Sequence, residues 1–150
     1  MKRLFLLTAV VCFLGCQSAS VPGLVRCEGV VTLDGTPADG VTVMLIPRDS
    51  ETQRNAIAVT DGAGKFRMTT LKENDGAMPG TYSVTVTKYE KSGEVVTLPE
   101  KSPETGQPLT FEPSVNRLPA AYENPTTSPL EMTVPQGGIK TANFELKSSI

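Results

Sequence analysis

The stretch "GTYSVTVTKY", residues 80–89, has the clearest strand pattern in this chain of 150 residues. Tyr82, Val84 and Val86 alternate with Thr and Ser side chains. Since successive side chains of a strand point to opposite faces, the apolar set faces a core and the hydroxyl set faces water. The pattern predicts a half-buried strand, which is typical of an antiparallel sheet.

Six further segments alternate in the same way and end at turn residues. They comprise residues 24–33, 41–47, 55–60, 65–70, 130–134 and 141–147. Asp34-Gly35 ends the first segment, and "PQGG", residues 135–138, separates the last two. The chain shows no convincing helix. We therefore expect an all-β fold in which residues 24–150 form one domain, a seven-stranded antiparallel β-sandwich.

A long insertion, residues 90–129, lies before the last two predicted strands. It is rich in Pro, Glu, Ser and Thr and lacks periodicity, so we expect irregular structure that is either partly disordered or functional. Its final part, "LPAAYENPTTSPL" (118–130), places Tyr122 between prolines. That part could lie along the sandwich with Tyr122 docked, or it could bind a partner.

The stretch "TDGAGKF", residues 60–66, looks most like a ligand loop. A calcium loop needs several oxygen ligands at alternating positions, and Asp61 has no suitable acidic partner nearby. A phosphate loop needs a longer Gly-rich run that leads into a helix, whereas a strand follows here. The turn interpretation fits better: Asp61 bonds the backbone, Gly62 and Gly64 tolerate positive φ, and Phe66 returns the chain to the core.

The amino terminus, "MKRLFLLTAVVCFLGC", has the parts of an export signal. Lys2 and Arg3 precede an apolar run of residues 4–14, and a small residue precedes Cys16. The run is shorter than the roughly 20 residues of a membrane span. We interpret residues 1–15 as a signal peptide; the alternative is a buried N-terminal helix of the domain.

Residues 14–16, Leu-Gly-Cys, resemble the lipobox of bacterial lipoproteins. In that interpretation Cys16 becomes the lipid-attachment residue and carries acyl chains such as palmitate, which hold the protein to a membrane. Residues 16–23 would then form a short tether. Ordinary secretion after Gly15 without lipid is the alternative. Cys27 is left alone, and its place on the apolar face of a strand favours a buried structural thiol.

Composition excludes several classes of function. The chain has no His, which removes Ser/His/Asp and Cys/His nucleophile pairs and His-ligated metal sites. Without Lys2 and Arg3 there are 12 basic against 16 acidic side chains, which gives no electrostatic basis for binding nucleic acid. We predict no catalytic, cofactor-binding or metal-binding residues and no cofactor. A hydrolase with paired carboxylates is the enzymatic alternative, and its candidates are Asp34, Asp39, Asp61 and Asp75.

Three motifs in order resemble the carboxypeptidase regulatory-like domain, a transthyretin-like seven-stranded β-sandwich. They are "GVVTLDGTPADGVTVMLIP" (29–47), "TDGAGKF" (60–66) and "PGTYSVTV" (79–86). Together with the lipobox and "LPAAYENPTTSPL", they make the chain similar to planctomycete lipoproteins that contain this domain. The resemblance covers nearly the whole mature chain. It implies a fold and an envelope location, and it implies no catalytic residue.

We therefore expect a non-enzymatic, lipid-anchored protein of the bacterial cell envelope, in the outer membrane or facing the periplasm. Its role would be structural or the binding of an envelope protein or glycan. The alternative is a carbohydrate- or small-ligand-binding module. The chain offers few aromatic side chains on which a sugar could stack, because it has no Trp and its tyrosines are only Tyr82, Tyr89 and Tyr122.

Overall fold

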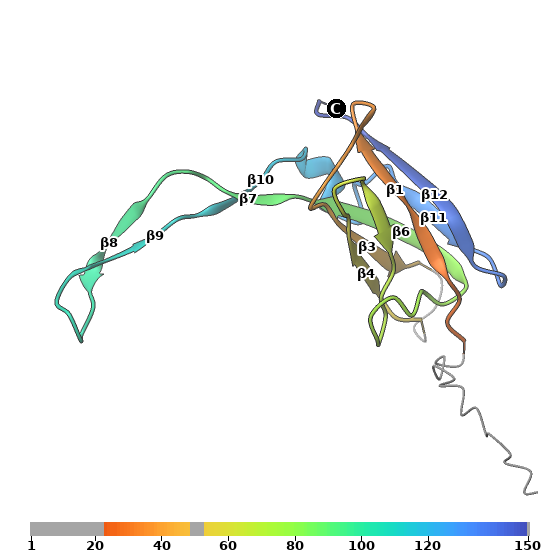
Figure 1. Cartoon of the computed structure of the whole chain (residues 1–150), viewed down its shortest axis with the longest axis horizontal. Helices are drawn as coiled ribbons and strands as arrows, with labels where there is room; N and C mark the ends of the chain where they lie inside the picture. The colour runs from red at the N-terminus through yellow and green to blue at the C-terminus, as the bar shows by residue number, and fades with distance from the viewer. Residues whose placement is uncertain (1–22, 49–52, 150) are drawn as a thin grey trace, which may run out of the picture.

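The computed structural model describes residues 23–48 and 53–149. Within these residues the protein is all-β: the one helical element is a 3₁₀ turn, η1(Ala120–Tyr122). Figure 1 shows two parts, a body made of two larger sheets and a long thin arm that projects away from it. The predicted fold class is confirmed at this level.

The first sheet of the body is organised around β1(Cys27–Leu33). β12(Ile139–Leu146) lies along one side of β1, and β2(Thr36–Pro37) and β5(Lys65–Arg67) share the other. The turn between β1 and β2 is the predicted Asp34-Gly35, where both residues have positive φ. This conformation suits a two-residue hairpin connection, because its twist matches that of the strands.

The second sheet has the order β11(Glu131–Val134), β6(Gly80–Thr87), β3(Thr42–Pro47) and β4(Ala56–Val59), and all its pairs are antiparallel. β6 contains the stretch with the clearest alternation, and it lies between β3 and β11. Tyr82, Val84 and Val86 are buried as expected. Thr85, expected to face water, is also buried; Met44 lies directly opposite it on β3.

Buried side chains from both sheets form one hydrophobic cluster, an arrangement consistent with a β-sandwich. The members contributed by β1, β3, β6 and β12 include Cys27, Val31, Val43, Leu45, Tyr82, Val84, Val86, Phe144 and Leu146. Phe66 of β5 stacks on Phe144 of β12, with 5.7 Å between ring centroids. The Tyr82 hydroxyl donates to the Met78 carbonyl at 2.7 Å, so this buried polar group is satisfied.

Each of the seven predicted segments contains a strand, but the prediction that all strands pair antiparallel was wrong for one pair. β1 and β12 run parallel, with Val31 opposite Phe144 and Leu33 opposite Leu146. A parallel pair needs a long connection between its strands. Most of the chain lies between these two, so they can run in the same direction.

The prediction of an irregular insertion over residues 90–129 was wrong in part, because four short strands form within or at the start of it. β7(Tyr89–Lys91) pairs with β10(Ser114–Asn116), and β8(Val96–Lys101) pairs with β9(Pro108–Phe111). These two antiparallel pairs follow one another along a single long ribbon, which we call the arm (residues 89–116). The interpretation of 118–130 as a docked segment holds for Tyr122, which is buried; its hydroxyl accepts a hydrogen bond from the Lys147 N–H at 2.9 Å.

The turn interpretation of residues 60–66 is confirmed. Asp61 Oδ1 accepts from the N–H groups of Ala63 and Lys65, both at 2.9 Å. Gly64 has a φ of +71°, and a Cβ at this position would lie 2.4 Å from the Val31 carbonyl oxygen. A glycine is therefore required at position 64 for two separate reasons, conformation and space. Gly62 has no positive φ and has open space around it.

The predicted signal peptide (1–15), Cys16 and most of the tether (16–23) lie outside the described residues. In the part of the chain that is described, no helix has the length and hydropathy needed to cross a bilayer.

Candidate interaction surface

The root of the arm is fixed to the body by a small set of polar contacts. Asn116 Oδ1 accepts from the N–H groups of Lys88 and Leu118, at 3.0 and 3.1 Å. The Arg117 N–H donates to the Lys88 carbonyl at 2.8 Å, and the Tyr89 hydroxyl donates to the Glu123 carboxylate. The outgoing and returning strands of the arm therefore leave the body side by side, in a defined register.

Ion pairs accompany this root. Glu90 contacts Lys88 at 3.1 Å and Arg117 at 3.3 Å, and Lys91 contacts Glu112 at 3.4 Å. A hydrogen bond from Lys88, helped by the charges of Lys88 and Arg117, lowers the pKa of Glu90 below its ordinary value. Pairs this exposed contribute little to stability, so their main effect is on orientation.

The outer half of the arm, β8 and β9, has one apolar face. Val96 lies opposite Phe111, and Thr97 lies opposite Thr110. Because residues opposite each other share a face and faces alternate along a strand, Val96, Phe111 and Leu109 lie on one side and the threonines on the other. No residue from 89 to 116 is buried. The apolar face of the arm therefore has no partner within the described chain.

The tip of the arm is a turn, and the outer arm carries acidic side chains that form no ion pair among the described residues. The Gly106 N–H donates to the Ser102 carbonyl at 2.8 Å, and Gly106 has a φ of +68°. Glu94, Glu100 and Glu104 take part in no ion pair among the described residues, and Lys101 is the only basic side chain between them. The outer arm therefore combines an apolar face with excess negative charge.

A second exposed apolar patch lies on the body, at β4. This strand is the edge of the second sheet, and its outward side chains Ile57 and Val59 are 42% and 61% exposed. Thr69 pairs with Ile57, and exposed Leu71 follows two residues later. We call Ile57, Val59 and Leu71 the β4 patch. The described residues have nine exposed large apolar side chains, and all belong to the arm or to this patch: Ile57, Val59, Leu71, Tyr89, Val95, Val96, Leu109, Phe111 and Val115.

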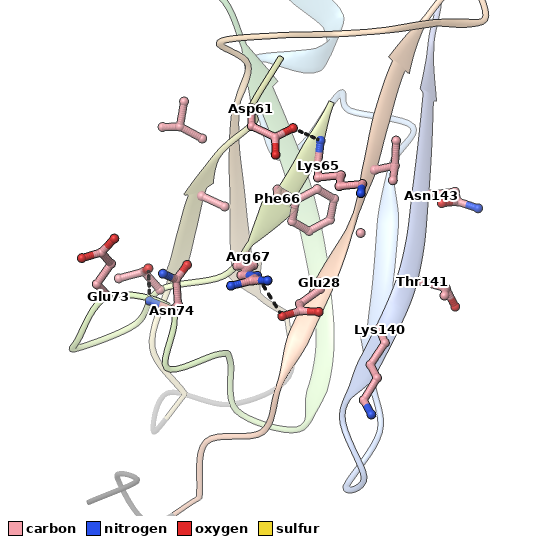
Figure 2. A pocket seen from close by; sticks show the side chains of 15 residues that line it. Glu28, Asp61, Lys65, Phe66, Arg67, Glu73, Asn74, Lys140, Thr141 and Asn143 are labelled. Carbon is pink, nitrogen blue, oxygen red and sulfur yellow. Dashed lines mark hydrogen bonds and ion pairs between the residues drawn. The ribbon is translucent and has the colours of Figure 1, made fainter. Parts of the chain in front are cut away.

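A groove of about 900 Å³ runs beside the β4 patch. It is open and lies across β4, β5, β1 and β12, so both sheets contribute to it. Figure 2 shows its polar side chains; those of Glu28, Lys65, Arg67, Lys140, Thr141 and Asn143 come from the first sheet. A groove of this size falls in the range of ligand sites, although open clefts of this kind also suit an extended polypeptide.

Some charged side chains of the groove form ion pairs and others do not. Glu28 contacts Arg26 at 2.7 Å and Arg67 at 3.1 Å, and the hydrogen bond from Arg26 is the largest cause that lowers the pKa of Glu28. By contrast, Lys65 and Lys140 take part in no ion pair among the described residues. Asp61 and Glu73, which also line the groove, likewise take part in no ion pair among these residues, so side chains of both signs remain available to a ligand or partner.

The structure does not bring the four candidate aspartates together in this groove: only Asp61 lines it. Asp61 is held by its own turn, and Asp75 accepts from the N–H groups of Thr70, Leu71 and Lys72. Asp34 accepts from the Ser148 N–H at 3.3 Å, and hydrogen bonding from the Ser148 side chain, followed by that from its N–H, lowers the pKa of Asp34. Residues 23–48 and 53–149 contain no group of three or more Cys, Asp or Glu side chains arranged to hold a metal ion.

Two further predicted positions can be placed. Cys27 is a buried free thiol, as predicted. Burial, together with the nearby Glu28 charge, raises its pKa to about 12. Of the three tyrosines proposed for a sugar platform, Tyr82 and Tyr122 are buried and only Tyr89 is exposed. A stacking platform built from several tyrosines is therefore not formed.

The sequence interpretation missed the apolar face of the arm. Val96 and Leu98 flank Thr97, and Leu109 and Phe111 flank Thr110, so a short alternation was present on both sides of a Gly-containing turn. Prolines at 99, 103 and 108 obscured it. Proline is tolerated on ribbon edges because an outward N–H has no ladder bond to lose.

The chain matches no family model, no curated protein and no solved structure.

Proposed function

We propose that this protein is a non-enzymatic, lipid-anchored module of the bacterial cell envelope, which uses the arm to bind another protein. The observation that carries the proposal is the contrast between a well-packed body and an ordered ribbon with an unpartnered apolar face. A two-stranded ribbon is marginally stable alone in water, so an arm of this length is best explained by a partner that covers it.

The membrane attachment belongs to the same proposal. Cys16 would carry acyl chains, residues 16–23 would form the tether, and the body would be a transthyretin-like sandwich of the carboxypeptidase regulatory-like kind. The described chain begins at Gly23, below the body in Figure 1, whereas the arm projects to the left. This arrangement supports the proposal because an anchored body could extend the arm away from its attachment point.

The test replaces Phe111 with a photo-crosslinking phenylalanine in the full chain, in cells that make it, followed by identification of the adducts. The expected result is a defined protein adduct in the envelope fraction. A Cys16→Ala variant should lose both palmitate incorporation and the envelope adduct. Absence of any protein adduct from position 111, or unchanged membrane attachment of Cys16→Ala, would contradict the respective half of the proposal.

A second candidate function is the binding of a carbohydrate or another small ligand, and the groove beside β4 favours it. Lys65, Lys140 and Asn143 offer hydrogen-bond donors there. Heteronuclear NMR titration with envelope saccharides should then shift signals of groove residues and spare the arm. No shift at millimolar saccharide would eliminate this alternative.

A further inference from the structure

We propose that the free edge of β12 binds an extended segment of another protein, which adds to the first sheet as one more strand. This surface is separate from the arm and goes beyond the proposed function. β12 pairs with β1 on one side, and on its other side no strand of the described residues pairs with it. Figure 1 shows β12 on the side of the body away from the arm, so one surface does not obstruct the other.

The backbone groups of every second residue of β12 point away from β1. The Asp34 N–H donates to the Leu146 carbonyl at 2.9 Å, so the backbone of Leu146 faces β1. Alternate residues of a strand direct their N–H and C=O groups to opposite sides, and the register of β12 on β1 is regular beyond Gly29. Asn143, Glu145 and Lys147 therefore face outward.

One of these outward donors is already used by the chain. The Lys147 N–H donates to the Tyr122 hydroxyl at 2.9 Å, which confirms the direction of these groups. The N–H groups of Asn143 and Glu145 have no acceptor among the described residues. Such groups repeat about every 6.8 Å, which is the spacing of another extended backbone and not that of a small ligand. The occupant that this edge fits is therefore an extended polypeptide.

The other edges of the body are shorter or covered. Ile57 of β4 exchanges two backbone hydrogen bonds with Thr69, both at 2.8 Å. β5 and β2 have three and two residues, and β11 has four, with Pro135 directly after it. β12 has eight residues without proline, and its inward side chains Ala142 and Phe144 are apolar. Short length, proline and inward charge, which usually prevent strand addition, are thus absent here.

The side chains beside this edge specify the kind of segment. Lys140, Asn143 and Glu145 are exposed, and neither Lys140 nor Glu145 takes part in an ion pair among the described residues. An antiparallel segment with a basic residue opposite Glu145 and an acidic residue near Lys140 satisfies both charges. The β12 edge of a second copy, paired about Asn143, sets Thr141 opposite Glu145 instead and leaves that charge without a basic residue opposite it.

The test uses a pentapeptide with blocked ends, Lys-Val-Thr-Val-Glu, titrated into the full chain and followed by NMR. We expect the amide signals of Asn143 and Glu145 to shift and their exchange with solvent to slow by at least about tenfold. N-methylation of the central Thr, whose N–H points to β12, should weaken binding at least about tenfold. N-methylation of the Val before it, whose N–H points away, should change the affinity less than about twofold.

Two variants of the chain repeat this comparison from the other side. Asn143→Pro removes an outward N–H at an edge position, where proline costs no ladder bond, and should weaken binding at least about tenfold. Asn143→Ala keeps the backbone donor and should bind like the unchanged chain. Thermal unfolding reports whether each variant is folded; if Asn143→Pro is not, the two N-methylated peptides decide the question alone.

Three results would overturn the inference. The first is no change at Asn143 and Glu145 with millimolar peptide. The second is equal binding of the two N-methylated peptides, which would mean that side chains and not the edge hold the peptide. The third is protection of these amides in the free chain that grows with protein concentration, which would give the edge to a second copy. None of these results concerns the arm, which the crosslink from position 111 tests separately.

Discussion

The body and the arm are both built from paired strands, but only the body has an interior. Phe66 of the body is 2% exposed and stacks on Phe144, whereas Phe111 of the arm is 48% exposed. The same side chain thus contributes folding free energy in one region and leaves an apolar surface in the other. We infer that the body holds the stability of the protein and that the arm is free to bind.

The largest expected effect compares these two phenylalanines. Phe66→Ala should lower the free energy of unfolding by about 3–5 kcal/mol, because it removes a buried ring and leaves a cavity. Phe111→Ala should change it by less than about 0.5 kcal/mol, because the ring is not packed. Chemical denaturation of both variants measures the difference. Similar losses from the two substitutions would show that the arm takes part in the folding core.

A smaller effect should separate two glycines of one turn. Gly64→Ala introduces a Cβ that meets the Val31 carbonyl at 2.4 Å and occupies positive φ, so we expect a loss of about 2–3 kcal/mol. Gly62→Ala, which has open space around it, should be nearly neutral. Equal melting temperatures for the two variants would mean that the turn does not fix β5 against β1.

Low pH should reduce the free energy of unfolding of the body, because carboxylates that accept hydrogen bonds in its turns become protonated. Burial of Asp75 raises its pKa, but N–H donors from Thr70, Lys72 and Leu71 outweigh this and leave the pKa below its ordinary value of 3.8. A lowered pKa gives stability that is present above the ordinary value and is lost as the pH falls through the value in the folded protein. Asp75→Asn should lower stability at pH 7 by about 1 kcal/mol and flatten the decline below pH 4. If the free energy of unfolding of this variant declined below pH 4 as steeply as that of the unchanged protein, groups other than Asp75 would cause the decline.

The smallest effect concerns thiol reactivity and leaves stability unchanged. A pKa of about 12 keeps the buried Cys27 thiol protonated, so iodoacetamide at pH 8 should modify it only after unfolding. A cysteine introduced at exposed Thr110 in the arm should react in the native protein. Peptide mapping by mass spectrometry reports each position separately. Rapid native modification of Cys27 would show that the first sheet opens.

Period-two alternation predicted the strands of the body well, because a strand with one buried face needs an apolar side chain at every second position. Tyr82, Val84 and Val86 are buried, as their spacing indicated. The parallel pairing of β1 with β12 could not be predicted, since alternation marks strands and not their neighbours. The strands of the arm were not predicted for a different reason: none of their side chains is buried. Pro99 and Pro108 were therefore compatible with a ribbon as well as with a loop.

The candidate site was predictable only in part. Asp61 and Gly64 were assigned correctly to a turn, because the local chemistry of Asp and Gly decides the conformation. The groove combines Lys65 of β5 with Lys140 of β12, which are far apart in sequence. Only the three-dimensional pairing of both strands with β1 brings these two lysines to the same sheet.

The most direct test of the division between body and arm removes the outer arm. Ser92 donates its N–H to the Pro113 carbonyl at 2.7 Å, so residues 93–112 can be replaced by an Asn-Gly turn that keeps the root. The shortened chain should unfold with a free energy within about 1 kcal/mol of the full chain and should no longer capture the envelope protein that the full chain binds. An unfolded product, or a shortened chain that still captures that protein, would contradict the account.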